Sequence, residues 1–401
     1  MNIGIIREGK KIPDKRTAFS PEQCQEIMKT YPFVRFYVQP SPIRCFKDEE
    51  YAAQGCIVQE DLRPCAIIFG IKEVPIDALL ASKTYLFFSH TIKKQPYNRK
   101  LLQAILEKRI ALIDYETLKN TKGERIVAFG RYAGLVGTYN GILAYGKKYD
   151  LFTLRSAHVL FDRKEMDIEL AKVILPPIKI ALTGNGRVTK GAIEMLEAMN
   201  IRKVSMEDYL HMTFDEPVYT QLRSADYHKR KDGKPFDNEF YTNPTVYKSD
   251  FQQFYQQTDM LVATAYWNPQ APVLFTKEET QRSDFKIRVI ADITCDINGS
   301  IPTTVQPSTI TEPLYDFNTQ SFEVETACSN LQHITVMAVD NLPCEMPRDA
   351  SVDFGRDLID RVLPSLVVQD TEQIIANAFV AKEGTLTSNF SYLEDYVSMV
   401  Y

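Results

Sequence analysis

The segment Lys179–Leu196 constrains the fold of this chain more than any other part, because an apolar run leads through a glycine turn into a helical pattern. The run Ile180–Leu182 is typical of a buried strand, and Gly184 and Gly186 occupy the turn that follows. Glycines leave space for phosphate groups, which the first N–H groups of a helix attract. The pattern predicts a dinucleotide site, although Thr189 stands where the usual G-x-G-x-x-G motif has its third glycine. Such a turn alone is as often an ordinary loop, so the rest of the chain must decide.

Composition excludes several classes of protein. The chain has 401 residues, of which 44% are hydrophobic and 25% charged, as expected of a globular protein with two or three domains. A net charge of -5 predicts no nucleic-acid partner, and no apolar stretch is long enough to predict a membrane span. Seven scattered cysteines without C-x-x-C spacing predict a reducing compartment, with neither a disulfide framework nor a metal site. We therefore expect a cytoplasmic enzyme.

The first 130 residues alternate short β-like runs with helical patterns. This alternation is typical of a mostly parallel sheet with helices on both faces. The run Cys65–Gly70 is continuously apolar, as in a strand that is buried on both sides. The predicted strands are 3–6, 34–38, 65–70, 85–89 and 110–113, and helices are predicted from Ser20, at 51–57 and at 100–107.

The remainder of the chain predicts a second domain of the same class. The polar, tyrosine-rich segment 219–250 is interpreted as a surface insertion. Helices alone are expected from Ser351 onward, with no further strand. Helices are also predicted at 130–149 and 156–175, and strands near Val204 and at 260–264, 287–291 and 334–339.

These patterns predict an α/β fold of two Rossmann-like, doubly wound parallel-sheet domains with a cleft between them. The first domain is expected to comprise residues 1–140 plus 345–401, and the dinucleotide-binding domain residues 141–344. Substrate and nicotinamide would meet in the cleft.

Polar residues follow three of the predicted strands at the point where each strand ends. Lys72 follows the run at 65–70, His90 follows the run at 85–89, and Glu116 follows the run at 110–113. The carboxyl ends of adjacent parallel strands meet at one edge of a sheet, so these side chains are expected at one rim. Each alone is most often an ordinary surface or structural residue, but together they have complementary acid–base character.

Seven motifs in one order carry a resemblance to a known family. They are Lys72-Glu73, FFSHTIK at 87–93, IDYE at 113–116, RIVAFG at 125–130, TGNGRVTKGA at 183–192, DITCDINGSI at 292–301 and DNLP at 340–343. The chain resembles lysine-forming saccharopine dehydrogenase, especially the lysine–2-oxoglutarate reductase half of the bifunctional aminoadipate semialdehyde synthase. Alanine dehydrogenase shares the wider fold and is the competing assignment.

The resemblance implies an NAD(P)-dependent oxidoreductase of lysine metabolism. It would interconvert saccharopine with L-lysine and 2-oxoglutarate by hydride transfer at a secondary amine. In this family a lysine and a histidine at the positions of Lys72 and His90 serve as base and acid–base group, and carboxylates at those of Glu73 and Glu116 tune them. An alanine dehydrogenase-like activity and a non-catalytic NAD(P)-binding regulator remain as alternatives. The expected partners are these small molecules, and the oligomeric state stays open.

The resemblance also implies binding residues. The substrate-binding positions correspond to Arg16, Lys72, Lys93, Gln95, Arg125 and Phe129, whereas Arg131 departs from the aromatic residue usual in stand-alone fungal members. The cofactor-binding positions correspond to Gly184, Gly186, Arg187, Ser205, Asp292, Asp340, Asn341, Leu342 and Pro343.

The choice between NAD and NADP depends on the end of the second Rossmann strand. NAD enzymes place a carboxylate there, about twenty residues beyond the glycines. That position falls near Ser205, and the nearest acids are Glu207 and Asp208. The sequence therefore permits a 2′-phosphate and predicts relaxed specificity or an NADP preference, unless Glu207 or Asp208 reaches the ribose.

Overall fold

The computed structural model describes residues 1–10 and 13–399, which form two compact units. Unit 1 comprises Met1–Phe129 with Pro347–Tyr401, and unit 2 comprises Gly130–Met346. The predicted first domain also includes residues 11–12 and 400–401, which lie outside the described residues. Each unit holds one eight-stranded, mostly parallel sheet, so the predicted class of two Rossmann-like α/β domains is confirmed.

The sheet of unit 1 has the order β18-β17-β6-β5-β4-β1-β2-β3. The six strands from the N-terminal segment are parallel, as their buried apolar runs predict, whereas β17 is antiparallel to β6 and forms a hairpin with β18. The prediction that no strand follows Ser351 is therefore wrong. The strands are β1 (Asn2–Ile5), β2 (Arg35–Val38), β3 (Ile57–Val58), β4 (Ile67–Phe69), β5 (Thr84–Phe87), β6 (Ala111–Asp114), β17 (Phe379–Lys382) and β18 (Thr385–Leu386).

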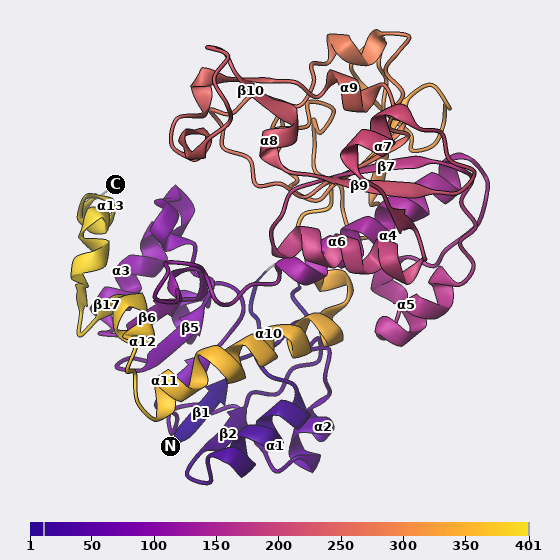
Figure 1. Cartoon of the computed structure of the whole chain (residues 1–401). Helices are drawn as coiled ribbons and strands as arrows, with labels where there is room; N and C mark the ends of the chain where they lie inside the picture. Colours follow the sequence, from indigo (N-terminus) through magenta and orange to yellow (C-terminus); the bar gives the residue numbers. More distant parts are fainter. Residues whose placement is uncertain (11–12, 400–401) are drawn as a thin grey trace. The chain divides into compact units, whose positions relative to one another are not determined.

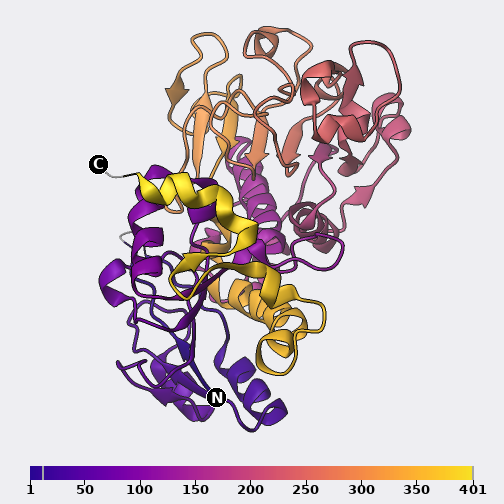
Figure 2. The same ribbon diagram turned by 90° about the vertical axis from the view of Figure 1, so that its left-hand side faces the viewer.

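The helices of unit 1 join segments that are far apart in the sequence. Helix α1 (Pro21–Thr30) begins with the predicted cap, because the Ser20 hydroxyl accepts a hydrogen bond from the Gln23 N–H. It packs against α10 (Pro347–Arg361), and α13 (Glu394–Ser398) packs against α3 (Arg99–Glu107), as Figures 1 and 2 show. The remaining helices are α2 (Asp48–Ala53), α11 (Leu363–Val367) and α12 (Ile374–Ala378).

The sheet of unit 2 has the order β15-β14-β16-β13-β12-β7-β9-β8. Strand β7 lies between β12 and β9. Strand β9 is almost wholly buried, so the predicted surface insertion from residue 219 begins inside a core strand. The strands are β7 (Lys179–Thr183), β8 (Arg202–Lys203), β9 (Val218–Leu222), β12 (Met260–Ala263), β13 (Val289–Asp292), β14 (Leu314–Phe317), β15 (Val324–Glu325) and β16 (Ile334–Met337).

The other elements of unit 2 include one helix that differs from its prediction. The helix expected over 156–175 is only a 3-10 turn followed by α5 (Arg163–Leu170), because Asp162 caps a new start. A separate hairpin, β10 (His228–Arg230) with β11 (Tyr247–Ser249), lies within the predicted insertion. The remaining helices are α4 (Gly130–Lys148), α6 (Arg187–Ala198), α7 (Met206–His211), α8 (Ser224–Tyr227) and α9 (Gln252–Tyr255).

Helices α4 and α6 cross at two glycines, side by side below β7 and β9 in Figure 1. A Cβ atom at Gly134 would lie 1.8 Å from the Val188 carbonyl oxygen, and one at Gly191 would lie 1.8 Å from the Arg131 carbonyl oxygen. Arg131 also forms an ion pair with Glu194 at 2.7 Å. The predicted domain boundary at residue 140 therefore falls inside α4, all of whose residues belong to unit 2. Among the helices described, none combines the length and apolar character that crossing a bilayer requires.

Candidate functional site

The carboxyl ends of β4, β5 and β6 bring together the acid–base residues of unit 1. These strands are adjacent and parallel, and their pairing places Phe69 level with Leu86 and Phe87 level with Asp114. Lys72 and Glu73 follow β4, His90 follows β5, and Glu116 follows β6. We call these four residues the charged rim.

His90 is held by a carboxylate that is itself paired twice. Its ring Nδ1 lies 2.8 Å from Glu73 Oε1, while Lys10 forms an ion pair with the other oxygen of Glu73. Burial raises the pKa of Glu73, but the hydrogen bonds from His90 and Lys10 outweigh it and lower the pKa to about 2. The His90 ring also stacks on Phe88, with 6.3 Å between ring centres. An ionised Glu73 can only accept, so Nδ1 donates and Nε2 is left for proton exchange.

The buried carboxylate of Asp114 links the turns after β5 and β6 by hydrogen bonds. Asp114 Oδ2 accepts hydrogen bonds from the Ser89 N–H at 2.8 Å, the Ser89 hydroxyl at 2.6 Å and the His90 N–H at 3.2 Å. Its other oxygen accepts from the Glu116 N–H at 2.8 Å. Burial raises the pKa of Asp114 despite these bonds. The positions of His90 and Glu116 are thus coupled through one side chain, which holds His90 in a left-handed backbone conformation at φ 51°.

Two predicted substrate-binding cations share the remaining rim carboxylate. Glu116 forms ion pairs with Lys93 at 3.0 Å and with Arg125 at 3.2 Å. Burial raises the pKa of Glu116, but these cations outweigh it and lower the pKa. Two positive charges against one negative leave the group with a net positive charge. The Arg125 guanidinium lies 5.4 Å from the centre of the Phe88 ring.

Arg16 differs from the other predicted substrate cations because it is buried. Its side chain is 3% exposed and donates to both oxygens of Asp14, from Nε at 3.0 Å and from Nη2 at 2.6 Å. Burial raises the pKa of Asp14, but Arg16 outweighs it and lowers the pKa to about 2. The guanidinium lies over the ring of Phe129, which stacks on Phe354. The structure thus places Arg16 and Phe129 together, in a packed cluster.

Glu8 and Asp14 are site residues that the sequence analysis missed. Glu8 accepts hydrogen bonds from the Ile71 N–H at 2.7 Å and the Lys72 N–H at 2.8 Å, so it fixes the backbone from which Lys72 projects. Burial and the neighbouring Asp14 raise the pKa of Glu8 to about 8. The available signal was the position of Glu8 shortly after β1, a strand that lies beside β4 in the same sheet.

Gln95 is the remaining substrate-binding prediction in unit 1. It follows the 3-10 turn Thr91–Lys93, and its backbone carbonyl accepts a hydrogen bond from the Tyr396 hydroxyl at 2.5 Å. Its side-chain oxygen is buried and accepts no hydrogen bond from the described residues. A polar atom in that state is available to a ligand.

The glycine turn of unit 2 has the form that the sequence predicts. Gly184 has φ 115°, and a Cβ there would lie 2.7 Å from the hydroxyl oxygens of Thr189 and Thr264. The Thr189 hydroxyl accepts from the Gly186 N–H at 3.1 Å and bonds to the Thr264 hydroxyl at 2.7 Å. Thr189, which stands where the motif has its third glycine, therefore stabilises the turn through its hydroxyl group. A Cβ at Gly186 would meet no atom within 4 Å, so the start of α6 faces open space.

A pocket of about 400 Å³ opens above this turn, and we call it the glycine-turn pocket. Its wall contains the turn from Thr183 to Val188, Arg187 included, the residues that follow β9, and several aromatic rings. Open glycines at a helix N-terminus, with flat rings nearby, suit the pyrophosphate and the base of a dinucleotide. The residues present therefore fit an NAD(P) group.

The other predicted cofactor residues do not lie among the described residues that line this pocket. Ser205 follows the edge strand β8 and caps α7, with its hydroxyl 2.8 Å from Asp208 Oδ2. Asp292 is buried and accepts from the hydroxyls of Thr294 and Thr304, each at 2.6 Å. Asp340, Asn341, Leu342 and Pro343 form the turn after β16. Their roles toward a cofactor stay predictions.

The described residues offer no alternative site for a metal. Within 1–10 and 13–399, no group of three or more His, Cys, Asp or Glu side chains is placed to hold an ion. None of the seven cysteines forms a disulfide within the part of the chain that the structure describes.

Comparisons with known proteins extend what the fold shows. The alanine dehydrogenase/PNT N-terminal domain family matches residues 4–136. The mitochondrial alpha-aminoadipic semialdehyde synthase of Mus musculus is 29% identical over 98% of this chain and 47% of its own length. The saccharopine dehydrogenase (NAD(+), L-lysine-forming) of Candida albicans is 25% identical over 93% of this chain and 94% of its own length. The solved structure of an L-alanine dehydrogenase covers 99% of both chains with a TM-score of 0.64 at 15% identity.

These comparisons separate fold from sequence relationship. The likeness to L-alanine dehydrogenase shows the two-domain fold alone. The chain spans about half the length of the aminoadipic semialdehyde synthases that it matches. The resemblance predicted from the seven motifs is confirmed, and this chain is a relative of the aminoadipic semialdehyde synthases and the saccharopine dehydrogenases.

Proposed function

We propose that this chain is an NAD(P)-dependent oxidoreductase that interconverts saccharopine with L-lysine and 2-oxoglutarate. The observation that carries the proposal is the charged rim, where Lys72 and a carboxylate-oriented His90 follow adjacent strands and Glu116 pairs with two cations, Lys93 and Arg125. The names of the sequence relatives point to the same chemistry.

The rim residues have separable roles in this reaction. Lys72 takes the proton of the secondary amine as the carbon–nitrogen bond is oxidised to an imine. His90 exchanges protons through Nε2 as water adds to the imine and the carbon–nitrogen bond breaks, which releases lysine and 2-oxoglutarate. The net positive group of Lys93, Arg125 and Glu116 attracts a substrate carboxylate.

The glycine-turn pocket holds the dinucleotide in this proposal. A bound nicotinamide supplies the hydride donor or acceptor. The turn from Gly184 to Arg187 contacts the pyrophosphate, and the N-terminal end of α6 stabilises its charge.

The test compares two substrate pairs with the purified chain. Oxidation of NADH and NADPH is measured with lysine plus 2-oxoglutarate and, separately, with pyruvate plus ammonia. Turnover with the first pair alone is the expected result. Turnover with the second pair would favour the alanine dehydrogenase-like alternative, and cofactor binding without turnover would favour the regulator.

We also propose a cytoplasmic location, which cysteines without a disulfide among the described residues support. Subcellular fractionation tests it. Recovery with mitochondria is the contrary result, in line with the names of the animal relatives.

A further inference from the structure

We infer that Tyr392 and Tyr396, near the C-terminal end of the chain, are positioning residues for the substrate. Their hydroxyl groups hold residues 91–98, which we call the rim loop and which carry two predicted substrate-binding residues, Lys93 and Gln95. We call the two tyrosines the C-terminal clamp. The inference rests on the proposed function only where that brings the rim loop to the substrate, because the clamp itself consists of contacts within unit 1.

The rim loop begins with a turn that is unfavourable by itself. The 3-10 turn Thr91–Lys93 lies between His90 at φ 51° and Lys94 at φ 54°. Residues other than glycine seldom adopt this left-handed conformation, and it persists where surrounding contacts impose it. The rim loop therefore depends on contacts from other parts of unit 1.

The two ends of the rim loop are fixed by the charged rim. His90 directly precedes the loop, and its ring Nδ1 lies 2.8 Å from Glu73 Oε1. Asn98 ends the loop, is 5% exposed and donates from its side-chain amide to the same oxygen at 3.4 Å. Lys93 and Gln95 lie between these two ends, so the part of the loop that carries them needs a separate support.

The C-terminal clamp supplies that support through two backbone carbonyls. The Tyr392 hydroxyl donates to the Ile92 carbonyl at 2.9 Å, and the Tyr396 hydroxyl donates to the Gln95 carbonyl at 2.5 Å. The first carbonyl directly precedes Lys93, and the second belongs to Gln95 itself. The clamp therefore fixes the backbone from which both side chains project.

The rings of the clamp also contact basic side chains of the same region. Lys94 Nζ lies 5.6 Å from the centre of the Tyr392 ring, and the Arg99 guanidinium lies 5.3 Å from the centre of the Tyr396 ring. Phenylalanine at either position would keep the ring and lose only the hydroxyl group. The contribution of the hydroxyls can therefore be measured separately from that of the rings.

The segment that carries the clamp is anchored without these hydroxyls. Tyr392 lies in the 3-10 turn Ser388–Leu393, which leads into α13, and Leu393 is fully buried. The Gln103 side chain of α3 donates to the Val397 carbonyl of α13 at 2.7 Å, and the two helices pack side by side (Figure 1). Loss of the hydroxyls should therefore release the rim loop and leave α13 in place.

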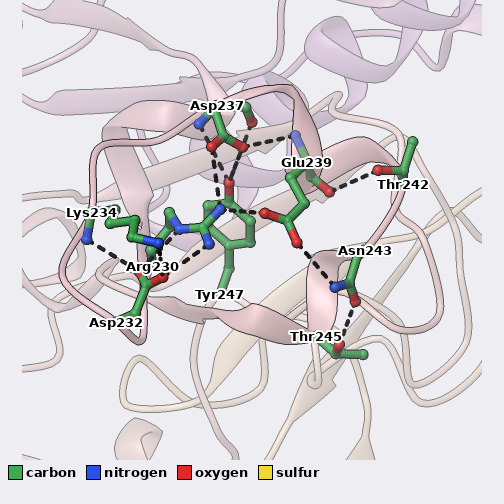
Figure 3. Close-up of polar contacts among 9 residues, drawn as sticks. All are labelled: Arg230, Asp232, Lys234, Asp237, Glu239, Thr242, Asn243, Thr245 and Tyr247. Atoms are coloured by element: carbon green, nitrogen blue, oxygen red, sulfur yellow. Dashed lines mark hydrogen bonds and ion pairs between the residues drawn. The ribbon is translucent and has the colours of Figure 1, made fainter.

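A contrast with unit 2 indicates why an uncharged clamp suits this position. Figure 3 shows Arg230 enclosed by Asp232, Asp237 and Glu239 in the insertion. The guanidinium donates to all three carboxylates, at 2.6 to 3.2 Å, and so fixes the hairpin of β10 and β11. Carboxylates placed in this way beside the charged rim would repel a substrate that carries carboxylates of its own. Tyrosine hydroxyls hold the rim loop without adding negative charge.

Hydrogen–deuterium exchange tests the clamp without any turnover. In the double variant Tyr392→Phe with Tyr396→Phe, the backbone N–H groups of residues 91–98 should exchange about tenfold faster than in the wild-type chain, the ratio expected for the loss of hydrogen bonds of this kind. Tyr97→Phe is the matched control, because Tyr97 lies in the same loop with 69% of its surface exposed, and it should leave exchange unchanged. Each single variant loses one hydroxyl and should give part of the effect, so the test also holds if the double variant unfolds.

Steady-state kinetics tests the effect on the substrate. The double variant should raise KM for 2-oxoglutarate about threefold or more and change kcat by less than about twofold, because His90 and Glu73 keep their own contacts. A merely structural role would not separate KM from kcat in this way. Tyr97→Phe should change neither quantity.

Three results would overturn the inference. Unchanged exchange of residues 91–98 in the tyrosine variants would show that the hydroxyls do not hold the rim loop. Faster exchange with an unchanged KM, or an equal rise of KM in Tyr97→Phe, would remove the clamp from substrate binding. A wild-type chain without turnover would overturn the proposed function and the substrate role of the clamp together, whereas the exchange rates would still decide whether the hydroxyls hold the loop.

Discussion

The two units place different chemistry at the same position of the same fold. In both, side chains gather at the carboxyl ends of parallel strands. The charged rim of unit 1 is dense in ion pairs, with Glu73 and Glu116 each shared by two basic groups. The glycine-turn pocket of unit 2 has no carboxylate among its described lining residues and many aromatic rings.

This difference indicates how one architecture can divide the work of a reaction. Proton transfer requires acid–base groups held in fixed orientation, and the paired carboxylates of unit 1 supply that. Binding of a large anionic cofactor requires backbone N–H groups, cations and flat surfaces, and unit 2 supplies those. Variants in each unit should therefore affect different measured quantities.

The largest expected effect is on turnover and belongs to Lys72. Lys72→Met should reduce kcat roughly 10³–10⁴-fold, the upper range for loss of a general acid–base group, because no other amine follows β4 at this position. Calorimetry should find cofactor affinity unchanged, since Lys72 lies in unit 1. Near-wild-type turnover across pH would show that Lys72 is not the base.

Arg16→Ala should lower stability before it affects binding. Removing one partner of a buried ion pair typically costs roughly 3–5 kcal/mol, and here it leaves Asp14 buried without its cation. The melting temperature, measured by circular dichroism, should fall. The double variant Asp14→Asn with Arg16→Ala is the control and should recover part of the loss. An unchanged melting temperature with a raised KM would instead make Arg16 a substrate-binding residue.

Arg125→Ala should act mainly on substrate binding and less on folding. Arg125 is half-buried and shares Glu116 with Lys93, so its removal leaves Glu116 still paired. We expect KM for 2-oxoglutarate to rise by about 1.5–3 kcal/mol of binding free energy, with kcat changed less. Lys122→Ala, an exposed change in the same segment, provides the comparison. A KM equal to that of the control would remove Arg125 from the substrate site.

The smallest expected effect is on the pH dependence of stability. It compares a buried carboxylate of unit 2, Glu345, with Glu73 of unit 1. Glu345 of unit 2 is 1% exposed and accepts a hydrogen bond from the Asn140 side chain at 2.9 Å. Burial raises its pKa from 4.5 to about 8, opposite to the lowered pKa of Glu73. A raised folded-state pKa gives stability that is present below the unfolded value and is lost as pH rises to about 8.

Glu345→Gln should remove that pH dependence. The variant and the wild-type chain should have similar melting temperatures near the unfolded pKa, and the variant should be more stable by roughly 1–3 kcal/mol above the folded pKa. Thermal melts across that range measure the difference. A constant difference between the two proteins at all pH values would mean that folding does not shift the pKa of Glu345.

The sequence predicts the N-terminal strands of unit 1 well because their signals are local. Continuous apolar runs such as Cys65–Gly70 mark buried parallel strands, and the residues directly after them form the charged rim. The pairing of His90 with Glu73 follows from the adjacency of β4 and β5. Asp14 is different: it lies in a loop two residues before Arg16, where no strand or helix pattern marks the pairing of the two side chains.

The errors in unit 2 come from spatial order, which a periodic pattern does not encode. Strand β9 has the sequence VYTQL, and its polar residues are not typical of a buried strand. The sequence therefore predicts the second Rossmann strand near Val204, in the segment that forms β8. In unit 1, the sequence does not predict strands β17 and β18, because a short hairpin at the edge of a sheet has little apolar signal of its own.

Unit 1 is formed by two segments that are separated in the sequence, and this has a consequence for synthesis on the ribosome. Unit 2 is one continuous stretch and can complete its sheet as soon as it emerges, whereas unit 1 requires the segment that follows it. Until β17 is made, one edge of β6 lacks its partner strand, and until α10 is made, α1 lacks the helix that covers it. The larger part of unit 1, which is made first, therefore has a sheet edge open to wrong pairing during the translation of the whole of unit 2.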